Sequence, residues 1–375
     1  MDPSRRIHLC LSVSCCLALC FWFFFPSIYR AGDYIRQTNP FSGQREVERD
    51  FSPTPQELAC LNGSFPPDQL GHSTPTPSAA EPIPNIVHFI FLQRLPSRRA
   101  EGDFGFLHYL AIRSAIVSLN PDAVYLHYGY ISSPPSRITA SRKFYTDKED
   151  LLVSKNHWIQ RLKSQVELKR YTKPLDGSIR HSAHVADTVR LELLLEHGGI
   201  YLDIDAFALR PFGRALNVPR PRSVLLGWEG GDRHGLCNAV IAARANSTFI
   251  DRWLKTYDHA DLNREWNYHS VILPKNLAAA HPDEVCELPP DAFFWPTWTW
   301  RHITWMHEPL SDAEATHWSK RIEDTGGSLF DNQLVYHAWS QMARDRYLKR
   351  LTPDIIRKED TRFNLMIRRF VEDDL

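Results

Sequence analysis

The sequence predicts an α/β domain built on a mostly parallel central sheet. Short apolar runs alternate with longer segments whose apolar residues recur at helical spacing, which is the pattern of strand–helix–strand units. Residues 85–91, NIVHFIF, form the first apolar run and follow a proline, as expected for a buried strand. Such sheets bind ligands beyond the carboxyl ends of their strands, so the functional residues are expected there.

The remaining elements are expected in order along the chain. Residues 106–119 carry apolar side chains at helical spacing and stop at an Asn-Pro pair, which predicts a helix. We expect further strands at residues 123–130, 166–171, 200–205, 224–228, 239–243 and 334–339. We expect further helices at residues 182–197, 249–257 and 268–280.

The charge balance excludes a general nucleic-acid binder. The 375-residue chain contains 44 Lys plus Arg and 44 Asp plus Glu, so its formal net charge is zero. A protein without a basic field does not attract a polyanion along its surface. Any anionic ligand must therefore be held by a local site.

The cysteines fall into two groups. Four of the seven lie in residues 10–20, so that Cys60, Cys237 and Cys286 remain for the rest of the chain. They show no C-x-x-C spacing, which argues against a zinc site. One disulfide is possible among these three. Cys237 with Cys286 is the first pair to test, although sequence spacing does not fix the pairing.

An N-terminal segment is expected to anchor the protein in a membrane. Residues 9–25 contain no charge and would span roughly 25 Å as a helix, which suits the thinner bilayers of the early secretory pathway. Arg5 and Arg6 precede this run, which favours a cytosolic tail at residues 1–8 and a transmembrane anchor at residues 9–28. A cleaved signal peptide is the alternative, but bulky aromatic residues stand where small ones should precede a cleavage site.

Composition divides the rest of the chain. Residues 29–82 are rich in proline and are expected to form an extended stem without a core. The folded domain is expected over residues 83–345, followed by a helical tail over residues 346–375. Asn62 and Asn246 each begin an acceptor triplet for N-glycosylation. With the anchor, they predict a single-pass type II glycoprotein of the Golgi or another secretory-pathway membrane, with its folded domain in the lumen.

Residues 184–212 carry the clearest signal of chemistry. An amphipathic helix ends at Gly198-Gly199, and a short buried strand then leads to Asp203 and Asp205. Side chains two apart on a strand share one face, and two adjacent carboxylates stay ionised when a cation lies between them or water covers both. Oxygen ligands favour a hard divalent ion such as Mn²⁺ or Mg²⁺, which can bridge the phosphates of a nucleoside diphosphate.

Asp187 and Arg190 lie three residues apart on the preceding helix and so face the same way. Together an acid and a base can hold neighbouring sugar hydroxyls. The plainer alternatives are a D-x-D that arose by chance at a strand end and a surface ion pair worth under about 1 kcal/mol. The combination of both pairs with Gly-Gly in one short segment favours a nucleotide-sugar site.

The stretch from Asp187 to Asp205 resembles the D-x-x-R…GGIYLDxD signature of glycosyltransferase family 32. Looser similarities to this family lie at residues 83–88 (IPNIVH), 238–243 (NAVIAA) and 335–339 (VYHAW). The resemblance covers about residues 83–339. It implies a GT-A fold, a nucleotide-sugar donor and retention of the anomeric configuration.

The resemblance also implies roles for single residues. Asp203 and Asp205 would be the catalytic residues, with Asp205 binding the metal directly and Asp203 touching ribose or sugar while supporting the metal. His337 is a third candidate ligand of the metal, although a lone histidine in a strand is more often structural. The residues implied to bind the donor are Asp187, Arg190, Gly199, Tyr201 and Asn238.

Two departures from the family pattern concern base stacking and the C-terminal lid. No second tryptophan follows the closing H-x-W, and residues 89–91 are Phe-Ile-Phe where a tryptophan is common. Residues 293–305, FFWPTWTWRHITW, are expected to be mainly core, with one or two rings exposed at the cleft.

The expected function is that of a metal-dependent hexosyltransferase. The donor would be GDP-mannose or a UDP-hexose, and the acceptor a glycan or glycolipid. A catalytically silent protein of the same fold, which holds a nucleotide sugar or a glycan, is the alternative. A glycosidase is disfavoured because its paired carboxylates lie on different elements several ångströms apart, whereas Asp203 and Asp205 are close neighbours in the chain.

Overall fold

The structure is a computed structural model of the 375-residue chain. It describes residues 22–24, 51–65, 81–95, 104–132, 153, 155–175, 178–179, 181–260, 262 and 267–375. The predicted anchor at residues 9–28 lies outside the described residues, apart from one helical turn at residues 22–24. No helix within the described ranges combines the length and the apolar character needed to cross a bilayer.

A seven-stranded sheet forms the centre of the molecule, with the strand order β3-β2-β1-β4-β7-β6-β8. All neighbouring strands are parallel except β7, which runs antiparallel to both β4 and β6. The predicted α/β class with a mostly parallel sheet is therefore confirmed. The strands are β1 Ile86–Leu95, β2 Ala123–Ser132, β3 Glu167–Arg170, β4 Gly199–Leu202, β6 Val224–Glu229, β7 Gly235–Ala243 and β8 Val285–Leu288.

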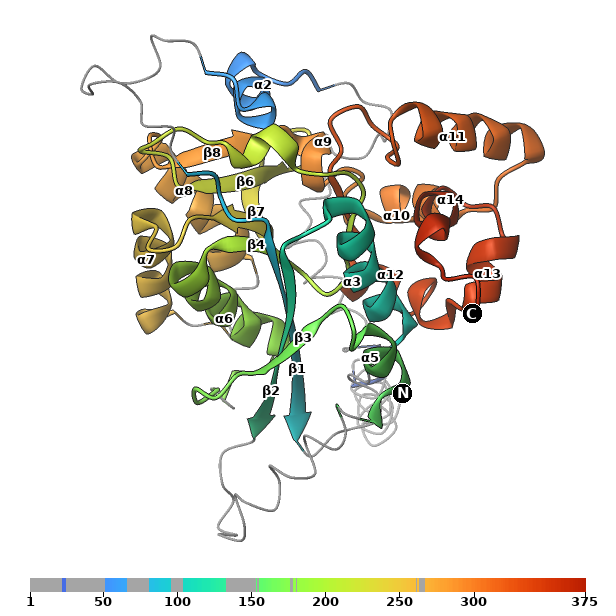
Figure 1. Ribbon diagram of the computed structural model, residues 1–375, viewed down its shortest axis with the longest axis horizontal. Helices are drawn as coiled ribbons and strands as arrows, with labels where there is room; N and C mark the ends of the chain where they lie inside the picture. Colours follow the sequence, from blue (N-terminus) through green and yellow to red (C-terminus); the bar gives the residue numbers. More distant parts are fainter. Residues whose placement is uncertain are drawn as a thin grey trace, which may run out of the picture.

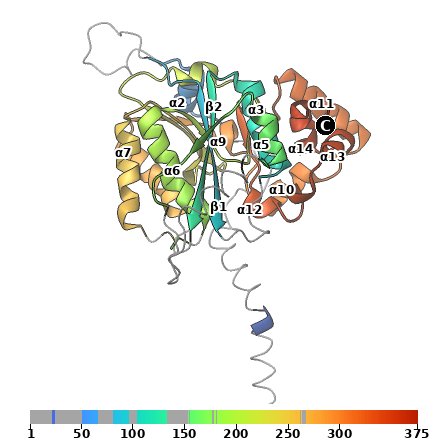
Figure 2. The same cartoon turned by 60° about the horizontal axis from the view of Figure 1, so that its bottom comes forward.

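Helices cover both faces of this sheet, as Figure 1 and Figure 2 show. One face is covered by α6 Ser182–His197, α7 Thr248–Lys255 and α8 Leu273–Ala280. The other is covered by α3 Phe106–Leu119 and α5 His157–Leu162. Two separate clusters of buried apolar side chains result, because the sheet lies between them.

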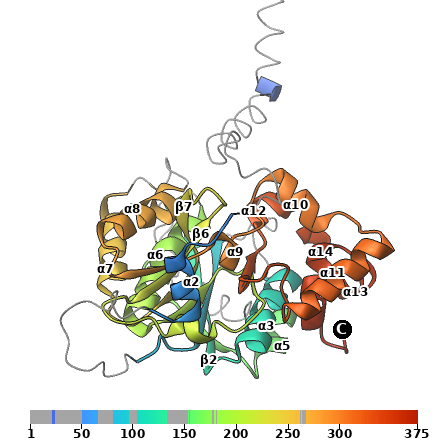
Figure 3. The same ribbon diagram turned by 90° about the horizontal axis from the view of Figure 1, so that it is seen from above.

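The C-terminal third adds short elements beside α3, so that the chain ends on that side of the molecule (Figure 3). A two-stranded sheet there pairs β5 Ala206–Ala208 with β9 Val335–His337. The helices are α9 Pro290–Phe293, α10 Trp300–His307, α11 Asp312–Asp324, α12 Ser340–Ala343, α13 Pro353–Lys358 and α14 Arg362–Ile367. Single turns lie at η2 Gly213–Leu216, η3 Thr256–His259, η4 Tyr268–Ile272, η5 Leu348–Arg350 and η6 Arg368–Phe370.

The segment predicted as a helical tail, residues 346–375, is helical but belongs to the core. Phe363 and Phe370 are fully buried and share a cluster with Phe207 of β5. The Phe207 and Phe363 rings meet edge to face, with their centroids 5.5 Å apart. These contacts mean that the folded domain extends to the C-terminus.

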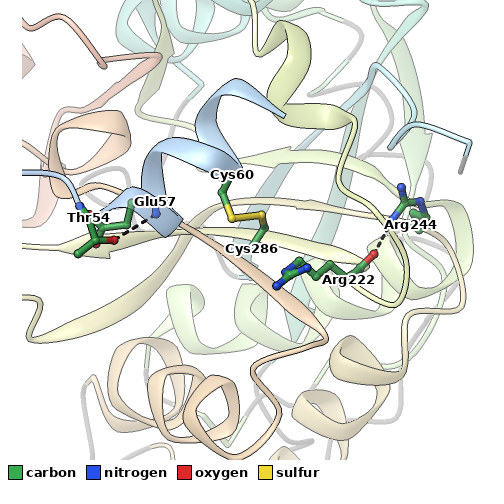
Figure 4. Close-up of a disulfide and its surroundings, with 6 residues drawn as sticks. All are labelled: Thr54, Glu57, Cys60, Arg222, Arg244 and Cys286. Atoms are coloured by element: carbon green, nitrogen blue, oxygen red, sulfur yellow. Dashed lines mark hydrogen bonds between the residues drawn. A yellow bond between two sulfur atoms is a disulfide. The ribbon is translucent and has the colours of Figure 1, made fainter. Parts of the chain in front are cut away.

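The predicted extended stem is wrong for residues 51–65, which fold against the domain. They contain helix α2, Pro55–Asn62, whose Cys60 forms a disulfide with Cys286 of β8 (Figure 4). Glu57 on the same helix is buried and pairs with Arg233 at 2.6 Å. A covalent bond and a partly buried ion pair therefore hold this short helix on the sheet.

The suggested pairing of Cys237 with Cys286 is also wrong. Cys237 lies on β7 as a buried free thiol. Strand β6 stands between β7 and β8 in the sheet, so these two cysteines are not on neighbouring strands. Cys60 reaches Cys286 because α2 packs on β8.

Candidate active site

The two aspartates of the D-x-D lie on a turn rather than on a strand. Strand β4 ends at Leu202, earlier than the predicted strand over residues 200–205. The backbone N–H of Ala206 donates to the carbonyl of Asp203 at 2.8 Å, which closes a tight turn from Asp203 to Ala206. The turn, and not the alternation of a pleated strand, therefore brings both carboxylates to the same side.

A third side chain joins them from the far end of the sequence. Strand β9 pairs with β5 so that His337 lies opposite Ala206. His337 Nε2 is 3.1 Å from Asp205 Oδ1 and 3.8 Å from Asp203 Oδ2. One ligand atom from each of the three residues lies within 4.8 Å of the other two.

This group fits a hard divalent cation. Ligands about 2.1 Å from one ion lie roughly 3 to 4 Å from each other, as His337 Nε2 does from one oxygen of each aspartate. Two carboxylates and one imidazole are also a donor set that Mn²⁺ or Mg²⁺ accepts. We define the metal group as Asp203, Asp205 and His337.

The charges in the metal group are strongly coupled. Burial acts to raise the pKa of Asp205, but attraction to His337 and hydrogen bonds from His337 and the Ser340 backbone N–H outweigh it and hold this pKa below its usual range. Burial raises the pKa of Asp203, against the attraction of Arg190 and His337. Burial lowers the pKa of His337, but the hydrogen bond to Asp205 and the attraction of Asp205, Asp203 and Glu229 together raise it above its usual range. Positive charge beside the two carboxylates is thus favoured, and either a protonated His337 or a bound cation can supply it.

A buried network around Arg190 adjoins the metal group. The Arg190 guanidinium lies 3.0 Å from Asp187 Oδ1 and 2.9 Å from Asp203 Oδ1, and it donates to the Asn238 carbonyl at 2.8 Å. Asn238 Nδ2 donates to Asp187 Oδ1 at 2.8 Å. The Tyr201 hydroxyl donates to Asp203 Oδ1 at 2.5 Å. One network therefore holds four predicted donor-binding residues beside Asp203.

The charged side chains at the centre of this network are buried. Only 3% of the Arg190 side chain and 6% of the Asp187 side chain are exposed, so the ion pair is not the surface pair considered as an alternative. Burial disfavours the charged guanidinium, yet attraction to Asp203 and other neighbours raises the pKa of Arg190 above its usual range. The arginine is therefore a fixed positive charge at the base of the site.

The metal group and the Arg190 network open into one cavity of about 640 Å³. Asp203, just after β4, and Glu229, the last residue of β6, line it, so it lies at the carboxyl ends of these two strands, as predicted. A volume of this size accommodates a nucleotide sugar or a comparable small ligand.

Comparisons with known proteins agree with this geometry. Residues 109–223 match the family model of the glycosyltransferase sugar-binding region containing the DXD motif. The chain is 36% identical over 299 residues to "Glucan organizing enzyme 1" of Cryptococcus neoformans var. grubii serotype A, covering 77% of this chain and 71% of that protein. The chain belongs to this glycosyltransferase family. The resemblance inferred from the residues between Asp187 and Asp205 is confirmed, and the protein is an enzyme that transfers sugar.

Solved glycosyltransferase structures also resemble it at low identity. The PaToxG glycosyltransferase is 15% identical, with 77% of this chain and 87% of that chain covered and a TM-score of 0.37. Mouse xyloside xylosyltransferase 1 is 10% identical, with 68% and 99% covered and a TM-score of 0.33.

Gly199 does not line the cavity of this glycosyltransferase, contrary to its predicted role in donor binding. It is the first residue of β4, at the opposite end of the strand from Asp203. Its φ is +100°, and a Cβ atom there would lie 2.6 Å from the carbonyl oxygen of Ile86. The glycine is needed for the close approach of β4 to β1.

Several residues of the cavity were not predicted from the sequence. His108 of α3 lines it, and burial lowers the pKa of this histidine to about 4. Glu229, Cys237 and Trp298 line it as well, and the Ser340 N–H binds Asp205. The aromatic run at residues 293–305 signalled Trp298 only as one of several rings, whereas the others lack any local signal because they reach the cavity through tertiary packing.

The two predicted glycosylation acceptors lie at the surface of the glycosyltransferase. Asn62 is exposed at the last residue of α2. Asn246 is exposed just before α7 and has a left-handed backbone with φ of +58°. Both positions are accessible to a modifying enzyme, and their glycosylation stays a prediction.

Proposed function

We propose that the protein transfers a hexose from a nucleoside-diphosphate sugar to a glycan or glycolipid acceptor, with a divalent metal ion and with retention of the anomeric configuration. The observation that carries this proposal is the common cavity, in which the metal group adjoins the buried network of Arg190, Asp187 and Asn238. A GT-A-type domain fits both the parallel sheet and this site at the carboxyl ends of its strands.

One set of cavity residues would hold the metal ion at the diphosphate, and another would bind the donor sugar. Asp203, Asp205 and His337 would hold a divalent ion, Mn²⁺ or Mg²⁺, which when bound neutralises charge on the diphosphate. Arg190 and Asp187 present a fixed donor and a fixed acceptor, and they suit neighbouring hydroxyls of the donor hexose. Asn238 orients Asp187 and Tyr201 orients Asp203, because each donates a hydrogen bond to that carboxylate.

Retention follows from attack on the face from which the leaving group departs. In this mechanism the acceptor hydroxyl approaches the anomeric carbon beside the departing diphosphate, whose oxygen takes the hydroxyl proton. The bond from the anomeric carbon to the phosphate oxygen breaks, and the bond to the acceptor oxygen forms. Fixed side chains favour such a path because they need little reorganisation as charge develops.

GDP-mannose and the UDP-hexoses remain the candidate donors. The Cryptococcus relative is named a glucan organizing enzyme, so glucan oligosaccharides are the first acceptors to test. Glycolipid and other glycan acceptors follow in the same panel.

We infer a lumenal location in the secretory pathway, with a single-pass type II anchor at residues 9–28. The disulfide between Cys60 and Cys286 supports it, because such bonds persist in oxidising compartments. The exposed acceptor residues Asn62 and Asn246 are consistent with the same location. Protease protection of the folded domain in sealed microsomes tests this inference, and digestion without detergent would contradict it.

Release of nucleotide from a panel of nucleotide sugars tests the proposed function. We expect one GDP- or UDP-hexose to release nucleotide with Mn²⁺ or Mg²⁺, to be silenced by EDTA, and to give faster release when an acceptor is added. Asp205→Asn, which keeps the shape of the side chain, should lower the rate at least about 100-fold because it weakens the metal group. Binding of a nucleotide sugar without any release would instead favour the catalytically silent alternative.

A further inference from the structure

A second polar pair lies in the cavity, apart from the donor-binding network. Glu229 is the last residue of β6, and its Oε1 accepts a hydrogen bond from Trp298 Nε1 at 2.7 Å. Glu229 is 5% exposed and Trp298 is 8% exposed, yet both line the cavity. The donor contacts proposed above use neither residue.

Strand β7 separates this pair from Arg190. Consecutive residues of a strand point to opposite faces of the sheet. Asn238 points to the α6 side, where it bonds Asp187. Cys237, the residue before it, packs in the same apolar cluster as Trp298, and its thiol is hydrogen-bonded to Glu229. The cavity therefore has two polar walls, one on each side of the sheet. Asp187 and Asn238 belong to the first wall, and Glu229 and Trp298 form the second.

The metal group lies between these two walls. Asp203 contacts Arg190 at 2.9 Å on the one side. On the other side, His337 and Glu229 line the same cavity, and opposite charges on them attract each other. A sugar bound against Glu229 would thus be near the metal group and opposite the donor-binding residues.

The backbone that carries Trp298 is firmly held. Trp339 Nε1 donates to the Pro296 carbonyl at 2.9 Å, and Gln333 Nε2 donates to the Trp295 carbonyl at 3.0 Å. The backbone N–H of Thr297 donates to His302 Nδ1 at 2.9 Å. The indole of Trp298 is therefore presented in one orientation, which Glu229 fixes further.

An indole beside a carboxylate is suited to a neutral sugar. The aromatic face packs on the apolar face of a pyranose ring, and the carboxylate accepts hydrogen bonds from hydroxyls. Burial raises the pKa of Glu229, against hydrogen bonds from Trp298 and Cys237, which lower it. A desolvated carboxylate gains from further hydroxyl donors and repels phosphate, so this wall disfavours the nucleotide part of the donor.

We propose that Glu229 and Trp298 form the subsite for the acceptor sugar, a neutral hexose unit whose hydroxyl is the nucleophile. This assignment rests on the proposed transfer from a nucleotide sugar. Glu229 accepts hydrogen bonds from hydroxyls that do not react, and Trp298 supports the ring. Together they position the acceptor across the metal group from the donor hexose.

Separate Michaelis constants for donor and acceptor test the assignment. The enzyme is assayed with Mn²⁺, the donor found in the nucleotide-release panel, and the methyl glycosides of glucose, galactose and mannose as acceptor probes. Glu229→Gln should raise the KM for the acceptor about tenfold or more, with the KM for the donor changed by less than about twofold. Trp298→Phe keeps a ring but loses the N–H, so it should shift the same constant in the same direction.

Glu287→Gln serves as the matched control, because Glu287 is a partly buried glutamate of β8 that does not line the cavity. It should leave both constants unchanged. An unchanged acceptor KM in Glu229→Gln, or an equal rise in both constants, would overturn the assignment. A wild-type enzyme that releases no nucleotide from any donor would instead contradict the proposed function itself.

Discussion

Arg190 is the residue on which the polar interior of the site depends. Its guanidinium is 3% exposed and is shared between Asp187, Asp203 and Asn238. Burying a charge is costly, so such an arginine is stable only while its partners remain. The Tyr201 ring also lies 4.6 Å from the guanidinium carbon, which adds a cation–π contact. Loss of this one side chain would leave Asp187 without its counter-charge, and Asp203 with only His337 beside it.

Arg190→Met should therefore destabilise the protein. We expect a loss of about 3 kcal/mol in the free energy of unfolding, because the buried Asp187 would then lack its counter-charge. Chemical denaturation at pH 7 measures it. Lys255→Met is the control, since it breaks an exposed pair with Asp251 and should cost under about 0.5 kcal/mol. Similar losses in both variants would contradict this account of Arg190.

At the scale of elements, strong periodic patterns predicted the structure well. The helices predicted at residues 106–119 and 182–197 have the same bounds as α3 and α6. Strands β5 and β8 were not predicted, although β4 and β9, which are equally short, were. Helices α9 to α12 were also missed, whereas α13 and α14 fall within the predicted helical tail at residues 346–375.

The candidate site likewise contains residues that could be predicted from the sequence and residues that could not. Asp203, Asp205 and Asp187 could be recognised because they lie close together in one motif. Glu229 and Trp298 are 69 residues apart and meet only because β6 and the segment before α10 converge. The sequence contains no local signal for such a contact.

Strands β1 and β2 carry a buried histidine pair that makes stability depend on pH. His88 Nδ1 lies 3.0 Å from His127 Nε2. Burial lowers the pKa of His127 from 6.5 to about 3, and that of His88 to about 4. The unfolded chain therefore binds protons as the pH falls below 6.5, while the folded chain does not until much lower pH.

Acidification from pH 7 to pH 5 should thus weaken the fold. For His127 alone we expect a loss of about 2 kcal/mol in the free energy of unfolding. His127→Gln removes this titration, so its stability should fall less between the two pH values. Urea denaturation at both values measures the difference. A variant whose acid sensitivity equals that of the wild type would show that the pair is not the cause.

Gly199 gives a prediction for the junction of β1 and β4. Gly199→Ala should destabilise the protein by about 3 kcal/mol, because its Cβ would lie 2.6 Å from the Ile86 carbonyl and its φ is positive. Gly213→Ala is a matched control, since its φ is +53° but nothing lies within 4 Å of an added Cβ. It should cost only about 1 kcal/mol of backbone strain. Equal thermal shifts in the two variants would refute the steric explanation.

At the scale of the whole molecule, the segment that carries α2 packs on the sheet although it is distant in sequence from the strand that it contacts. Helix α2 is bound to β8 by the bond between Cys60 and Cys286, which are 226 residues apart. Glu57 of α2 also holds Arg233, in the loop that follows Glu229 and leads into β7. The N-terminal segment therefore supports the loop beside one wall of the cavity, which the composition of residues 29–82 did not reveal.

Removal of the disulfide should lower stability without changing the fold. Cys286→Ala is expected to cost about 2 to 4 kcal/mol, because the unfolded chain loses a constraint across a very long loop. Cys60→Ala combined with Cys286→Ala should cost about the same as either change alone, since each removes the same bond. Thermal denaturation under non-reducing conditions measures these values. Additive losses, or no loss in the single variants, would contradict a stabilising bond between these two cysteines.

Direct binding of Mn²⁺, followed by electron paramagnetic resonance, tests the central claim that Asp203, Asp205 and His337 hold a catalytic cation. We expect the wild-type enzyme to bind one Mn²⁺ in the presence of nucleoside diphosphate. Asp205→Asn should weaken this binding at least about tenfold, whereas Asp291→Asn, which changes a buried aspartate outside the cavity, should not. Equal Mn²⁺ affinity in Asp205→Asn and the wild type would contradict the account.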